Sequence, residues 1–209
     1  METIKSHGNA DHFIILIPHR DVLNHIALYR EKLFAAGFHG AFSFPPSAPL
    51  ARVSVPFCRN ELRELALNIR SFTRETGGKI RSMGTALVHS QDSFFPIKNK
   101  AEVQDDTAMR GKNYSFFGLV LDLSPIEKLF PGTKGNKMQI ISPAVLCAAL
   151  VNAEEKCAKT PFAEEVPSVS FRAASLANLS IRRMDEGETG FSLEWRIGEP
   201  VWLPAFKKE

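Results

Sequence analysis

Apolar and polar residues alternate with two different periods in the first third of the chain. Residues 12–18 (HFIILIP) form a short apolar run whose length and isoleucines predict a buried strand. The next segment predicts a helix, because apolar residues recur there at helical spacing: Val22, Ile26, Tyr29 and Leu33. Asp21 is the expected N-cap of this helix, and Gly37 is its expected C-terminal glycine. The pattern therefore predicts a strand followed directly by an amphipathic helix.

A second strand and helix are predicted next. Residues 50–57 alternate in polarity, which places Arg52 and Ser54 on one face of a strand and the apolar side chains on the other. Residues 60–76 predict a helix with an apolar stripe formed by Leu62, Leu65, Ile69 and Phe72. Basic residues lie along one side of it: Arg59, Arg63, Arg70 and Arg74. This side is either a surface that contacts RNA or an ordinary solvated helix face.

The rest of the chain is dominated by predicted strands. They cover residues 79–89, 114–123, 137–151, 171–181 and 190–197, and the last two form a hairpin around a charged turn at 185–188. Proline-rich residues 40–49 and polar residues 92–113 are predicted loops, and residues 152–167 form a loop or a short helix. Helices come early and strands late, so we predict a single α+β domain spanning residues 1–209.

Composition and charge favour some classes of protein and ligand over others. The chain has 209 residues, of which 44% are hydrophobic and 23% charged, as in ordinary soluble domains. A net charge of +3 suits an anionic ligand such as RNA or a nucleotide without the charge density of a DNA-binding protein. The three cysteines form no CxxC pair and the histidines no metal-binding spacing, so no metal, disulfide or other cofactor is expected. We find no signal core or membrane-spanning run, and expect a cytoplasmic protein, monomeric by default.

Four segments together resemble one known family. They are the opening strand and helix at 13–36, the segment 49–57 (PLARVSVPF) with its following helix, the apolar segment 141–148 (ISPAVLCA), and the closing strands at 171–181 and 191–195. In order and spacing the chain resembles the 2H phosphoesterases, which include the 2′-5′ RNA ligase-like cyclic phosphodiesterases. The resemblance implies a bilobal fold, in which two pseudo-symmetric antiparallel sheets with helices outside enclose a central cleft.

The resemblance also implies what this chain lacks. Family members carry two histidines, each followed two residues later by a hydroxyl side chain, and they act as general base and general acid on a phosphodiester. At the first motif this chain has Arg52 and Ser54, and at the second Pro143 and Val145, with Ser168–Ser170 as an alternative register. Arginine stays protonated, and proline and valine carry no transferable side-chain proton. No residue is therefore assigned a catalytic role at these positions.

The sequence leaves three hypotheses about function. The first is a catalytically inactive protein of this fold, in which Arg52 and Ser54 bind the phosphate of a nucleotide, an RNA end or another phosphorylated ligand. The second is an active phosphodiesterase with a non-standard site that uses histidines such as His19 or His89. The third is a protein-interaction domain on the same scaffold. For Arg52 and Ser54 a solvated strand position is the alternative, and for Pro143 it is a strand-edge or bulge proline.

Overall fold

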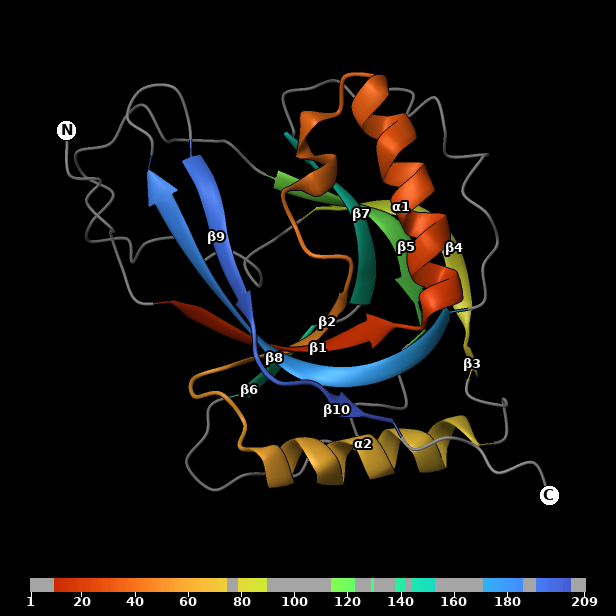
Figure 1. Cartoon of the computed structure of the whole chain (residues 1–209), viewed down its shortest axis with the longest axis vertical. Helices are drawn as coiled ribbons and strands as arrows, with labels where there is room; N and C mark the ends of the chain where they lie inside the picture. The colour runs from red at the N-terminus through yellow and green to blue at the C-terminus, as the bar shows by residue number, and fades with distance from the viewer. Residues whose placement is uncertain are drawn as a thin grey trace.

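The computed structural model describes residues 10–74, 79–89, 114–122, 129, 138–141, 144–152, 171–185 and 191–203. Within these ranges the fold is α+β, as predicted, with helices beside two antiparallel sheets (Figure 1). The elements are β1 (Asp11–Pro18), α1 (Arg20–Ala35), the 3-10 helix η1 (His39–Phe42), β2 (Ala48–Val53), α2 (Arg59–Thr73), β3 (Lys79–Ile80), β4 (Ser82–His89), β5 (Tyr114–Leu121), β6 (Met138–Ile140), β7 (Ala144–Asn152), β8 (Phe171–Asp185), β9 (Phe191–Ile197) and β10 (Val201–Trp202).

The larger sheet is organised around β8. Its strand order is β10-β8-β1-β2-β6, and β3 and β9 also pair with β8. The predicted hairpin is confirmed, because β9 pairs with β8 from Leu179 opposite Ile197 to Asp185 opposite Phe191. The smaller sheet has the order β4-β5-β7. All of these pairings are antiparallel.

The segment predicted as one strand at 137–151 forms two strands in different sheets. β6 pairs with β2 in the larger sheet, and the Ile141 N–H donates to the Leu50 carbonyl at 2.8 Å. β7 then pairs with β5 in the smaller sheet. The chain therefore crosses from one sheet to the other at this point, which brings β2 and β7 into contact.

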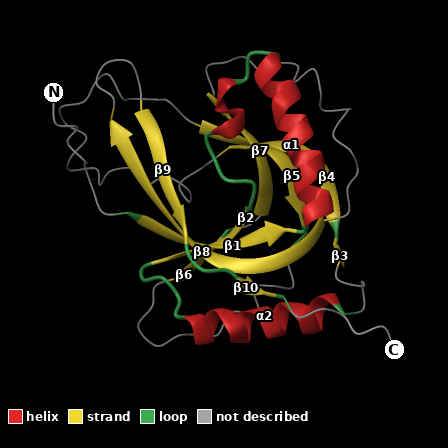
Figure 2. Ribbon diagram, viewed as in Figure 1, coloured by secondary structure: helices red, strands yellow, loops and turns green. Residues whose placement is uncertain are grey.

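The helices lie on different sides of the molecule. Figure 2 shows α2 along one side of the larger sheet and α1 beside the smaller sheet. Leu62, Leu65 and Ile69 of α2 share a buried cluster with Ile14 and Ala51 of the larger sheet. A second buried cluster joins the opposite face of that sheet to the smaller sheet through Phe13, Ile15, Leu179, Val120, Val145 and Cys147. The larger sheet is thus covered by α2 on one face and by the smaller sheet on the other.

Two predicted boundaries are wrong for local reasons. His19, and not Asp21, occupies the N-cap of α1; Asp21 lies in the first turn, where its Oδ1 accepts the Val22 N–H at 2.9 Å. β2 ends at Val53 and not at Phe57, because the chain bends at Ser54 and Phe57 turns into the core beneath α2. The predicted C-terminal glycine of α1 is confirmed, since Gly37 has a φ of 95°, which a side chain would oppose.

Several predictions fall outside the described residues. They are the loop at 92–113, the segment after Asn152, the tip of the hairpin and both Pro143 and Ser168–Ser170. The predicted loop at 40–49 contains the short η1 helix and the first residues of β2. No helix in the described ranges has the length and apolar character needed to cross a membrane.

Candidate ligand-binding site

Arg52 lies on the face of the larger sheet that packs against the smaller sheet. It stands directly opposite Phe13 of β1 and Gln139 of β6. Residues directly opposite in antiparallel strands point to the same face, and Phe13 belongs to the buried cluster between the sheets. The Arg52 side chain nevertheless retains 28% exposure. Its guanidinium therefore lies at the edge of the inter-sheet core, where solvent reaches it.

Asp11 holds the Arg52 guanidinium in place. The Nη2 of Arg52 donates to the Oδ1 of Asp11, which lies two residues before Phe13 and so shares its face. The described residues give Arg52 this one hydrogen bond, and a guanidinium carries five N–H donors. The ion pair fixes the orientation of the side chain and leaves donors that a bound anion can occupy.

Apolar residues and one exposed indole continue this face across the sheet. Opposite Asp11 lies Ile181 of β8, and opposite Ile181 lies Trp195 of β9. Two strand spacings of about 4.8 Å place the Trp195 backbone roughly 10 Å from that of Asp11. Ile181 is buried, whereas Trp195 is 41% exposed and Gln139 is exposed. We define the Arg52 face as Arg52, Asp11, Gln139, Ile181 and Trp195.

Of the other predicted motif residues that the structure describes, one is exposed after the end of β2 and one is buried in the core. Ser54 is exposed beyond the end of β2, so strand alternation does not bring it onto the Arg52 face. Val145 of β7 is 7% exposed and belongs to the same buried cluster as Phe13. Arg52 and Val145 therefore border one core between the sheets, but Val145 supplies only apolar surface. Pro143 and Ser168–Ser170 lie outside the described residues.

The histidine side chains described in the structure are not on the Arg52 face. His12 lies opposite Val53 and points to the face that α2 covers, where its Nδ1 is 2.9 Å from the Ser180 hydroxyl. His25 is exposed on α1, and His19 is exposed just before that helix. The side chains of His39 and His89, and all of His7, are outside the described part of the chain. Among the described residues, no histidine side chain therefore lies beside Arg52.

His19 forms a separate cluster with two charged residues. Its Nδ1 is 2.7 Å from the Oδ1 of Asp21, and the other carboxylate oxygen of Asp21 is 3.9 Å from Arg172. Burial opposes ionisation of Asp21, but hydrogen bonds from His19 and Val22 and the charges of His19 and Arg172 outweigh it and lower its pKa. The carboxylate orients the imidazole, as an acid does for a histidine base.

Sequence reasoning named Arg52 but missed its neighbours. Asp11 and Trp195 had no signal of their own, because their proximity to Arg52 depends on the pairing of β1 with β2 and of β8 with β9. Alternation within the predicted strands gives the face of each residue only after the pairing partners are known. Gln139 was not identified either, because it lies in the segment predicted as one long strand and faces Arg52 only through the pairing of β6 with β2.

Comparisons with known proteins found no matching family model, curated protein or solved structure. Within the described residues, no three His, Cys, Asp or Glu side chains gather closely enough to hold a metal ion. The candidate site therefore rests on the geometry of the Arg52 face itself.

Proposed function

We propose that this protein is a catalytically inactive 2H phosphoesterase-like protein that binds a phosphorylated ligand, a nucleotide or an RNA end, on the Arg52 face. The observation that carries the proposal is the partly exposed guanidinium of Arg52, oriented by Asp11 beside the inter-sheet core. A forked guanidinium keeps one N–H on a carboxylate while it donates others to phosphate oxygens.

The arrangement of the sheets supports the resemblance. In a 2H-like fold the two motif strands border a shared site between the lobes. Here β2 carries Arg52, β7 carries Val145, and the two strands are in contact although they belong to different sheets. We propose that the two sheets correspond to the two lobes of that fold.

The chemistry of the motif positions supports binding without cleavage. A general base must accept a proton near neutral pH, and an arginine side chain does not. Val145 has no proton to transfer, and His12, which neighbours the site in sequence, points to the opposite face. The Arg52 face is suited to orienting a phosphate through the guanidinium N–H donors that the described residues leave free.

Calorimetric titration with 2′,3′-cyclic AMP tests this function. The variant Arg52→Gln removes the charge and is expected to weaken binding about 10- to 100-fold, as loss of one or two charge-assisted hydrogen bonds does. Arg196→Gln is the matched control, because Arg196 is an exposed arginine on the opposite face of the same sheet. Equal affinities of the wild type and Arg52→Gln contradict the proposal.

The His19 cluster supports a second candidate function, a phosphodiesterase with a non-standard site. A histidine oriented by Asp21 beside Arg172 combines a proton acceptor with a cation for phosphate. This candidate predicts turnover of 2′,3′-cyclic AMP that His19→Gln lowers at least 100-fold and that Arg52→Gln leaves unchanged. Absence of turnover in the wild type, or full activity of His19→Gln, rejects it.

A further inference from the structure

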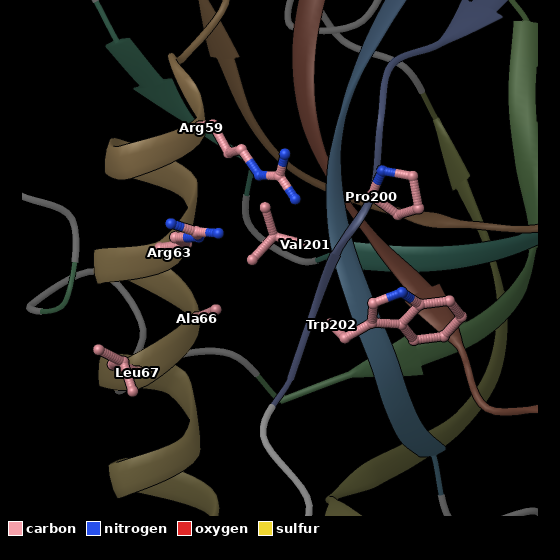
Figure 3. Close-up of a pocket in the computed structure, with 7 residues that line it drawn as sticks. All are labelled: Arg59, Arg63, Ala66, Leu67, Pro200, Val201 and Trp202. Atoms are coloured by element: carbon pink, nitrogen blue, oxygen red, sulfur yellow. The ribbon is translucent and has the colours of Figure 1, made fainter.

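A pocket of about 360 Å³ lies between α2 and β10, away from the Arg52 face (Figure 3). Its α2 side includes Arg59, Arg63 and Leu67, which lie on one side of the helix at spacings of four residues. Its β10 side includes Val201 and Trp202. The pocket shares no residue with the Arg52 face.

The pocket is positively charged. Its lining contains two arginines and no carboxylate. The part of the chain that the structure describes provides no hydrogen bond or ion pair for the Arg63 side chain. Arg59 is paired with Glu199 through two contacts, Nη2 to Oε1 at 3.1 Å and Nη1 to Oε2 at 3.4 Å, and both side chains are more than half exposed. Such an exposed pair contributes little, so an anion can compete for Arg59 at small cost.

The pocket also has apolar walls that remain open to solvent. Val201 is 8% exposed and packs in the core beneath α2, so it forms the closed end. Leu67 is 53% exposed and the Trp202 indole is 70% exposed. Figure 3 shows the Arg59 side chain directed from α2 toward β10, with the Trp202 ring beyond the strand. Because Val201 packs toward α2, alternation along β10 turns the Trp202 indole away from the helix. Leu67, Pro200 and Val201 therefore form the apolar border beside the two arginines.

The edge of β10 argues against an added peptide strand as the occupant. β10 has two residues, and Pro200 before it and Pro204 shortly after it lack the N–H groups that a new strand would need. The size of the pocket instead lies within the range of roughly 300–1,000 Å³ that is common for small-molecule sites.

We propose that this pocket binds a small anionic ligand that carries an apolar ring. Arg63 and Arg59 hold the anionic group, and Leu67 and Pro200 contact the ring. Because the residues differ, the proposal does not rest on the function assigned to the Arg52 face. Glu199 competes with the ligand for Arg59 and sets how readily the pocket fills.

Fluorescence of Trp202 tests the proposal directly. The chain has two tryptophans, so Trp195→Phe leaves Trp202 as the single reporter and alters the other site. In this background we expect AMP to change the emission saturably. Adenosine, which lacks the anion, and inorganic phosphate, which lacks the ring, are expected to bind at least 10-fold more weakly. A linear response to AMP, or equal affinity for all three probes, overturns the proposal.

Further variants in the same background assign the signal to the pocket. Arg63→Gln is expected to weaken AMP binding at least 10-fold, and Glu199→Gln to strengthen it about 3-fold or more by releasing Arg59. Arg20→Gln, an exposed arginine in the first turn of α1, is the matched control and is expected to bind like the parent. Circular dichroism checks that each variant is folded. Binding that survives Arg63→Gln but is lost in Arg52→Gln belongs to the Arg52 face and overturns the proposal.

Discussion

The side-chain amide of Asn178 on β8 binds both backbone groups of Phe57. Its Oδ1 accepts the Phe57 N–H at 3.0 Å, and its Nδ2 donates to the Phe57 carbonyl at 2.8 Å. These are the bonds that a neighbouring strand would make, but here they hold the bend between β2 and α2. One side chain therefore fixes the position from which α2 starts along the larger sheet.

Replacing Asn178 is predicted to destabilise the fold. Asn178→Ala removes two hydrogen bonds and leaves the Phe57 backbone without these partners, at a cost of about 2–3 kcal/mol in the free energy of unfolding. Urea denaturation measures this difference. Asn24→Ala, at an exposed position of α1, is the control and is expected to change stability by less than about 0.5 kcal/mol. Equal stability of the two variants would show that the bend is held by other contacts.

Arg30 is predicted to stabilise the fold through its aliphatic stem and its bonds to carbonyl oxygens. It is 5% exposed, its Nη2 donates to the carbonyls of Phe44 at 2.5 Å and Cys147 at 3.1 Å, and its Nε has no partner among the described residues. Arg30→Ala leaves a cavity and two unpaired carbonyls, so we expect a loss of about 2–4 kcal/mol. Arg30→Met keeps most of the stem and avoids the cost of a buried charge, so its loss is expected to be about 1 kcal/mol smaller. Thermal unfolding that ranks Arg30→Met below Arg30→Ala contradicts this account.

Cys147 is predicted to be unreactive in the folded protein. Burial raises the pKa of its thiol to about 12, and the nearby Arg30 charge only partly opposes this shift. The thiolate is the reactive form, and it is scarce at pH values well below the pKa. Iodoacetamide at about pH 8 should therefore label the exposed Cys58 and leave Cys147 unlabelled until the chain unfolds, as peptide mass spectrometry measures. Rapid native labelling of Cys147 would require that the core around it opens.

Asp21 is predicted to contribute to acid sensitivity. Its folded-state pKa is lowered, so its carboxylate stabilises the fold above the unfolded pKa of about 4. This contribution is lost as the pH falls through the folded-state pKa. The fall in Tm between about pH 5 and pH 3 should be smaller for Asp21→Asn than for the wild type. Glu31→Gln, an exposed acid on the same helix, is the control; an equal acid response in Asp21→Asn and the wild type contradicts the prediction.

The local parts of the fold were predictable from sequence. β1, α1, α2 and the β8–β9 hairpin follow from periods that lie within each segment, and the structure confirms these elements. The helix arginines Arg59 and Arg63 were also identified as one side of α2. Their role in a pocket was not predictable, because β10 is a two-residue strand whose position depends on pairing with β8.

The candidate site could not be predicted from sequence, because contacts between residues far apart in the chain form it. Asp11 and Arg52 are separated by 41 positions, and Trp195 reaches their face only through the registers of β8 and β1. The break between β6 and β7 at residues 141–144 was not predicted, because it arises from pairing: β6 pairs with a strand of the larger sheet and β7 with a strand of the smaller sheet. A one-residue change of register would move Arg52 to the α2 side, so no local pattern fixes its environment.

We propose above that Arg52 holds a phosphate that the protein does not cleave. Phosphorus NMR of 2′,3′-cyclic AMP titrated with the protein tests both parts in one measurement. We predict a saturable shift of the cyclic phosphate resonance with the wild type, no such shift with Arg52→Gln, and no monoester resonance with either protein. Appearance of a monoester with the wild type, or an equal shift with the wild type and Arg52→Gln, would contradict this proposal.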